Sequence, residues 1–136
     1  MNANRNLFQR ALVFHRTAVA WLGGEQPVVP RERVLARANA CAHQGAGKGA
    51  CPHNVNRPIY EFPTAPAAEE LRRRIEIKDQ RAMHTSLDPE LHVCELCGCH
   101  LATKVWEPIE LAAVDFPVAD APEWCWVKRE NSPANV

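Results

Sequence analysis

A small α+β fold with two or three helices and extended, proline-rich arms is predicted from three observations. The chain has 136 residues, a length that favours one domain. Segments with helical periodicity come early, and a short cysteine-bearing hairpin follows them. Eleven prolines interrupt regular elements, and much of the 46% apolar share is alanine, so the predicted core is thin. A chain with so small a core usually needs additional stabilisation from a disulfide, a bound metal or a partner subunit.

The first predicted helix covers residues 4–22, where apolar side chains from Leu7 to Trp21 recur at steps of three and four. Gly23 ends it. We expect three parts: an N-terminal amphipathic helix (1–26) that acts as an arm or binds a partner, a domain stapled by its cysteines (27–130), and a flexible C-terminal tail (131–136).

A second helix is predicted from Arg31 to about Ala42, with Pro30 as its first residue. Its expected apolar face holds Val34, Leu35, Ala38 and Cys41. Glycine and proline are frequent in residues 43–58, which we therefore expect to be loop.

A third helix is predicted from Ala67 to Arg81. Its apolar face is small, consisting of Leu71, Ile75 and Met83, so we expect this helix to be mostly solvated or to rest on another molecule.

The segment from Leu91 to Val93 alternates like a strand that leads into Cys94, and the segment from Leu101 to Trp106 is the expected returning strand. The tail from Pro108 onwards is predicted to form short extended pieces.

The sharpest motif is the sequence Cys94-Glu-Leu-Cys97-Gly-Cys99-His100. Two thiolates separated by two residues can hold one tetrahedral zinc ion from a tight turn. A strand, a cysteine knuckle and a second strand are the zinc-ribbon or zinc-knuckle arrangement, which we expect at the centre of the fold. Three alternatives stay open: buried structural thiols, disulfides in an oxidised particle, and a redox Cys-x-x-Cys pair.

Two cysteines do not close a structural zinc site, so other ligands must come from distant segments. The leading set is Cys41, Cys94 and Cys97 with Cys51 or one of two histidines, His43 and His53. Cys99 and Cys125 either bind a second ion with a histidine such as His100, or pack beside the first site.

Charge excludes some classes of function. Sixteen basic and sixteen acidic residues cancel, which argues against a uniformly basic coat for nucleic acid. The halves differ: residues 1–68 carry a net charge of +5 and residues 69–136 a net charge of −5. No membrane span or secretory segment is expected, and a reducing cytoplasm favours metal-bound thiols over disulfides.

No catalytic constellation is evident in the sequence. The chain lacks a phosphate-binding glycine loop, a His-Glu-x-x-His motif and the His-x-Glu of the zinc deaminases. We therefore expect a non-enzymatic protein without a small-molecule substrate, in which zinc holds the fold.

The run Cys94-x2-Cys97-Gly-Cys99-x-Leu101-x2-Lys104, followed by Cys125 beside Trp126, resembles small zinc-binding proteins of tailed bacteriophages and prophages. Arg33-x3-Arg37-x3-Cys41 matches the helix that leads into the family's first cysteine. Two positions depart from the pattern: Gln44 stands where the family has its second cysteine, and Trp126 stands where a proline follows the last one. The resemblance implies zinc binding and a phage setting, without an established activity.

Two functions follow as expectations. The first is a structural or assembly protein of a phage particle, located in the virion after assembly in the host cytoplasm, or otherwise cytoplasmic, with virion proteins or copies of itself as partners. The second is a regulatory zinc ribbon that binds nucleic acid through a basic helix (Arg72, Arg73, Arg74, Lys78 and Arg81). Zero net charge makes nucleic acid the less expected partner.

Overall fold

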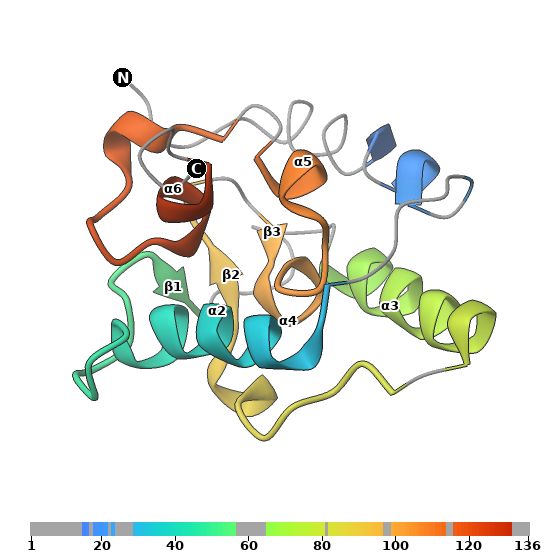
Figure 1. The fold of residues 1–136 in the computed structure, drawn as a ribbon, viewed down its shortest axis with the longest axis horizontal. Helices are drawn as coiled ribbons and strands as arrows, with labels where there is room; N and C mark the ends of the chain where they lie inside the picture. Colours follow the sequence, from blue (N-terminus) through green and yellow to red (C-terminus); the bar gives the residue numbers. More distant parts are fainter. Residues whose placement is uncertain are drawn as a thin grey trace.

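The computed structural model describes residues 15–16, 18–21, 23, 29–56, 65–80, 82–96, 99–113 and 116–131. Its helices are α2 (Arg31–His43), α3 (Ala65–Asp79), α4 (Leu101–Lys104), α5 (Ile109–Ala112) and α6 (Trp126–Glu130), and its strands are β1 (Asn54–Val55), β2 (Val93–Cys94) and β3 (Cys99–His100). Short 3₁₀ turns lie at Asp88–Glu90 and Val118–Asp120. Helices therefore surround a very small sheet (Figure 1), which confirms the predicted small α+β class.

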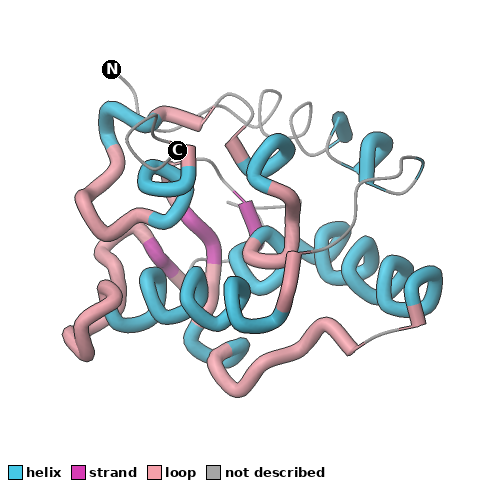
Figure 2. Tube along the Cα trace, in the orientation of Figure 1, coloured by secondary structure: helices cyan, strands magenta, loops and turns pink. Residues whose placement is uncertain are grey.

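The three strands form one antiparallel sheet in the order β1-β2-β3, which lies between the helices (Figure 2). The prediction of loop throughout residues 43–58 is wrong at β1. The Asn54 side chain holds this strand through three hydrogen bonds. Its Nδ2 donates to the carbonyl oxygens of Cys41 (3.2 Å) and Glu90 (2.9 Å), and its Oδ1 accepts from the His92 N–H (2.8 Å).

The returning strand predicted from Leu101 to Trp106 is also wrong. The return is the two-residue strand β3, and the chain then turns directly into α4. Leu101 and Val105 are both buried, and the Val105 N–H donates to the Leu101 carbonyl oxygen at 3.1 Å. Apolar residues four apart fit one helical face as well as a strand, and here the helical hydrogen bond decides.

Helix α2 begins and ends within one residue of its predicted bounds, with Pro30 as its N-cap. Val34 and Ala38 are fully buried, as predicted, but Leu35 is 38% exposed. The face turned to the core is completed by a charged residue, Arg37, which is 1% exposed.

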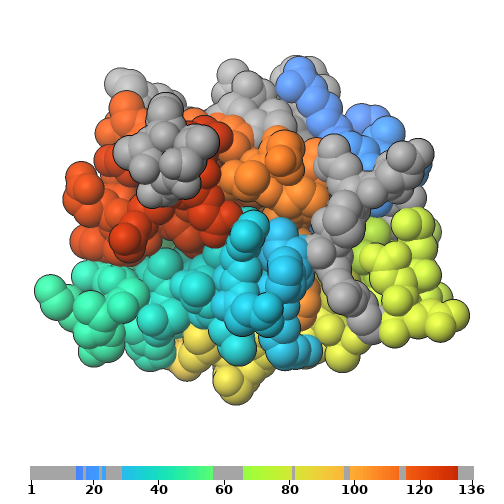
Figure 3. Space-filling view, in the orientation of Figure 1, coloured from blue at the N-terminus to red at the C-terminus, as the bar shows by residue number. Residues whose placement is uncertain are grey.

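The buried guanidinium of Arg37 joins α2 to the C-terminal segment. Its Nε and Nη2 donate to the two carboxylate oxygens of Glu130 at 2.9 and 2.6 Å, and its Nη1 donates to the carbonyl oxygens of Val105 and Glu107 at 3.0 and 2.7 Å. The Trp126 ring centre lies 4.2 Å from it. The C-terminal segment and α2 accordingly pack against each other in the space-filling view (Figure 3).

Helix α3 is exposed over most of its described residues, as predicted, and its narrow buried face packs on α4 and β3. Leu71 and Ile75 are buried against these elements, and so is Arg72, which is 5% exposed. Arg72 donates to the carboxylates of Asp88 and Glu69, each at 2.8 Å, and to the carbonyl oxygens of Met83 (3.2 Å) and Ala102 (3.3 Å).

These contacts weaken the nucleic-acid interpretation of α3. Arg72 is unavailable to phosphates, Arg73 and Arg74 both pair with Glu70, and Lys78 lies 3.7 Å from Asp79. Arg81, the last residue of the proposed basic set, lies outside the described residues.

We predict that Arg72→Ala destabilises the protein by about 2–3 kcal/mol, because it leaves Asp88 and two carbonyl oxygens in the interior without their donor. Thermal unfolding should show this as a fall of several degrees in Tm. Arg73→Ala is the matched control: that side chain is 63% exposed, and its loss should change the stability by less than about 0.5 kcal/mol. Equal effects of the two substitutions would contradict the assignment of Arg72 to the core.

The tail is more regular than predicted. Instead of extended pieces it forms α5, a 3₁₀ turn and α6, and it contributes Phe116, Trp126 and Val127 to the core. Trp21 is 1% exposed and belongs to the same core. Most of the predicted N-terminal helix and residues 132–136 lie outside the described residues. Among the described helices, none is long and apolar enough to cross a membrane.

Candidate metal centre

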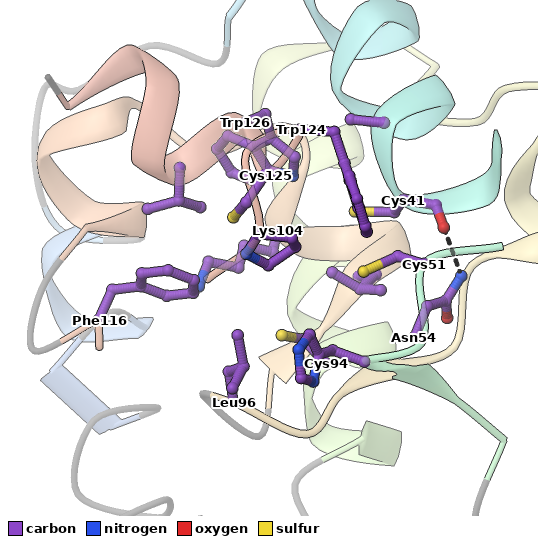
Figure 4. A pocket seen from close by; sticks show the side chains of 15 residues that line it. Cys41, Cys51, Asn54, Cys94, Leu96, Lys104, Phe116, Trp124, Cys125 and Trp126 are labelled. Carbon is purple, nitrogen blue, oxygen red and sulfur yellow. Dashed lines mark hydrogen bonds between the residues drawn. The ribbon is translucent and has the colours of Figure 1, made fainter. Parts of the chain in front are cut away.

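Four cysteines from three distant parts of the chain line one pocket. Cys41 comes from the last turn of α2, Cys51 from the loop after it, Cys94 from the end of β2, and Cys125 from the residue before α6. The cavity among them has a volume of about 30 Å³, room for an ion or one or two waters. Figure 4 shows the four side chains directed into this space.

Local backbone structure brings the first two cysteines together. The chain leaves α2 through Gln44, Gly45 and Gly47, which all have positive φ (55°, 74° and 71°). The loop then folds back, so that the Cys51 N–H donates to the Cys41 carbonyl oxygen at 2.9 Å. Glycine adopts this left-handed backbone without steric cost, which explains the glycine-rich composition between the two cysteines.

The β1–β2 pairing brings Cys94 to the same place. Asn54, which binds the Cys41 carbonyl oxygen, is the register partner of Cys94. The Glu95 N–H also donates to the His53 carbonyl oxygen at 2.9 Å. Three cysteines are therefore positioned by backbone hydrogen bonds and by the Asn54 side chain, within and between two segments about forty residues apart. Cys125 is added where α6 docks on α2 through Arg37.

Burial and neighbouring thiols dominate the electrostatics of the pocket. Burial, and after it the nearby thiols of Cys125 and Cys51, raise the pKa of the Cys41 thiol to about 12. A hydrogen bond from the Trp126 side chain and the charge of Lys104 act in the opposite direction. Several thiols within electrostatic reach of one another disfavour ionisation unless a cation joins them.

Of the six predicted cysteine ligands, Cys41, Cys51 and Cys94 are brought together in this pocket, and Cys125, which the sequence left unassigned, joins them. Cys97 lies outside the described residues. Cys99 does not line the pocket. It pairs with Cys94 across the β2–β3 ladder, and its Sγ lies 3.7 Å from the Nζ of Lys104.

Of the three candidate histidines, one lines the pocket and two do not. His53 lines the pocket, and its Nδ1 lies 3.0 Å from the Oε2 of Glu95. His43 lies outside the pocket lining and pairs with Glu90, Nε2 to Oε1, at 3.2 Å. His100 is also elsewhere: its Nδ1 lies 2.8 Å from the Thr103 Oγ1, and burial lowers its pKa.

The donor types in the pocket fit zinc, since thiolates with an imidazole nearby are the usual ligands of structural zinc sites. The indole Nε1 of Trp124, which also lines the pocket, is buried with no hydrogen-bond partner in the described structure. Cys97 is not among the described residues. Within the described residues, no group of three His, Cys, Asp or Glu side chains is close enough together to hold a metal ion.

Sequence reasoning missed the other residues that line the pocket. Lys104, Phe116, Trp124 and Trp126 form part of its walls. Lys104 is the last residue of the quoted motif, where it was given no role, and it is 3% exposed. The available signal was the apolar residues around Lys104, from Leu101 to Trp106, which fit a strand as well as a helix.

Comparison of the chain with protein-family models, with curated proteins and with solved structures gave no match. The interpretation of the pocket therefore depends on its own residues.

Proposed function

We propose that the cysteine-lined pocket is a structural zinc site and that the protein is a non-enzymatic structural or assembly protein. The observation that carries this proposal is that the partly buried Cys41, Cys51, Cys94 and Cys125 all line one small pocket. Cysteines so far apart in sequence meet by chance less readily than they meet around a shared ligand.

The chemistry of the pocket favours a structural zinc over a catalytic one. A catalytic zinc keeps an open position for water or substrate and usually has histidine or carboxylate ligands, whereas thiolate-rich sites are closed. Zinc binding at such a site contributes folding free energy on the order of 10 kcal/mol.

Two ligand sets are compatible with this proposal. In the first, Cys41, Cys51 and Cys94 are completed by Cys97 or Cys125. In the second, His53 replaces one thiolate, with Glu95 holding its Nδ1 so that the other ring nitrogen is free to ligate. A carboxylate partner of this kind is usual for histidines that bind metals.

The proposed setting is a phage particle, where other virion proteins or copies of this chain are the partners. The support is the likeness of the cysteine motif to small phage proteins, together with the opposite charges of the two halves of the chain. If the purified protein is a compact monomer with no affinity for any capsid or tail protein, this part of the proposal fails.

Mass spectrometry under native conditions tests the zinc site. We expect about one zinc per chain and loss of the folded state when a strong chelator removes it. Protein that is purified without metal and stays folded in chelator would contradict the proposal.

Zinc binding should also release protons. Burial and the neighbouring thiols raise the pKa of Cys41 to about 12, so this thiol is protonated at pH 8 and must lose its proton to ligate zinc. The apparent zinc affinity therefore rises with pH, about tenfold per pH unit for each proton that is released. Cys41 still releases a proton on zinc binding above pH 9, where an ordinary thiol is already ionised and releases none.

Calorimetric titration with zinc at pH 8, in buffers of different ionisation enthalpy, counts the released protons. The Cys41→Ala variant should release fewer than the wild type. Equal proton release from the two proteins would contradict the assignment of Cys41 as a ligand.

A further inference from the structure

Lys104 occupies an unusual position for a lysine. It is the last residue of α4, its side chain lines the cysteine pocket, and it is 3% exposed. Lysine is almost never fully buried unless its charge is paired. Here Nζ lies 3.7 Å from the Sγ of Cys99 and 4.7 Å from the centre of the Phe116 ring. The ammonium thus contacts both a sulfur atom and an aromatic face.

The sheet explains why this ammonium lies beside the pocket. Cys94 and Cys99 are register partners across β2 and β3, and paired residues project to the same face of a sheet. Cys94 lines the pocket, and Cys99 stands next to it and accepts the Lys104 hydrogen bond. The charge of Lys104 also acts to lower the pKa of Cys41, although burial and the neighbouring thiols raise it by more.

A zinc ion bound by several thiolates carries excess negative charge, and a nearby lysine ammonium can offset it. Four thiolates around one Zn²⁺ leave an excess of negative charge, and three thiolates still leave some. Excess charge is costly behind apolar walls such as Leu96, Phe116 and Trp124. A fixed positive charge at the wall reduces this cost without occupying a ligand position.

We propose that Lys104 is the charge-compensating residue of the zinc site: its ammonium, anchored by Cys99 and Phe116, offsets the negative charge of the thiolate ligands and so sets the affinity for zinc. This inference rests on the proposed zinc site and deepens it. It makes Cys99 the anchor of the lysine and not a ligand. Lys104 therefore acts on the metal through the thiolates, as a positioning residue.

Two measurements on the full chain test the proposal. The first is zinc affinity, measured by competition with a chromophoric chelator. The second is the sulfur-to-cobalt charge-transfer band of the protein loaded with Co²⁺ in place of zinc. Loss of the nearby ammonium raises the energy of the thiolate electrons and moves this band to longer wavelength, an effect that a purely structural role of the lysine would not produce.

The variants are chosen to separate charge from packing. K104M removes the charge and keeps a similar volume, K104Q is a second neutral variant should K104M fail to fold, and K104R restores the charge. Lys128→Met is the matched control, because Lys128 donates to the Ala121 carbonyl oxygen at 3.0 Å and does not line the pocket.

We expect the neutral variants to bind zinc about tenfold to a hundredfold more weakly, as is typical for loss of a residue that supports metal ligands. Their cobalt band should shift to longer wavelength, K104R should lie close to the wild type, and Lys128→Met should match it. If the wild type binds zinc and the neutral variants bind it equally well with an unshifted band, the role of Lys104 is overturned while the zinc site stands. If the wild type binds no metal, both proposals fail.

Discussion

Replacing Cys94 by serine is expected to abolish tight zinc binding and to unfold the centre of the protein. Cys94 ends β2, lines the pocket and lies between both neighbouring strands, so its sulfur connects the sheet to α2 and to the segment before α6. A serine hydroxyl is a poor zinc ligand, and a structural site with one ligand missing loses much of a contribution on the order of 10 kcal/mol. Such a loss is comparable to the whole stability of a typical domain, about 5–15 kcal/mol.

The measurement is zinc content by elemental analysis together with the circular dichroism of the purified variant. Cys99→Ser is the matched control, since Cys99 is the cross-strand partner of Cys94 but does not line the pocket. We expect Cys99→Ser to keep its zinc and its fold, with at most a weaker affinity through Lys104. A Cys94→Ser variant that remained folded with a full complement of zinc would show that Cys94 is not a ligand.

The second large effect is expected for Arg37→Ala. This substitution leaves the Glu130 carboxylate and the carbonyl oxygens of Val105 and Glu107 without their donor, and it removes the cation that lies over the Trp126 ring. Breaking a buried ion pair from one side costs about 3–5 kcal/mol. For a chain of this length the lower figure corresponds to a fall in Tm of roughly 10 °C, which thermal unfolding at saturating zinc would measure.

Arg33→Ala is the control on the same helix, because Arg33 is exposed and lies one turn away. Its substitution should leave the Tm within about 2 °C of the wild type. Arg37 also holds α6 on α2, so Arg37→Ala should weaken zinc binding by loosening Cys125. A variant with unchanged Tm would mean that the Arg37–Glu130 pair does not connect the two segments.

The long helices were predictable because local rules decide them. Pro30 at the N-cap and apolar residues at helical spacing place α2 within one residue of its expected bounds, and α3 within two. The short elements were not predictable in this way. A strand of two residues has no periodicity, and β1 depends on the Asn54 side chain bonding to Cys41 and Glu90.

The burial of charged side chains in the core could not be predicted from the local sequence. Arg37 and Lys104 look like surface residues because their partners are distant in the sequence or aromatic: Glu130 is 93 residues from Arg37, and Phe116 faces Lys104. The cysteine cluster was partly predictable, since Cys41 at a helix end, Cys51 in a flexible loop and Cys94 at the hairpin can meet with little strain. Cys125 could not be assigned, because α6 reaches the pocket through the Arg37 ion pair.

In the proposed zinc site, sulfur atoms from distant segments surround one zinc ion. X-ray absorption at the zinc edge of the purified full-length protein measures this directly. We predict a first shell dominated by sulfur at about 2.3 Å, with three or four sulfur ligands per zinc and at most one nitrogen at about 2.0–2.1 Å. A first shell of oxygen and nitrogen alone, or a protein that retains no zinc at all, would contradict the account.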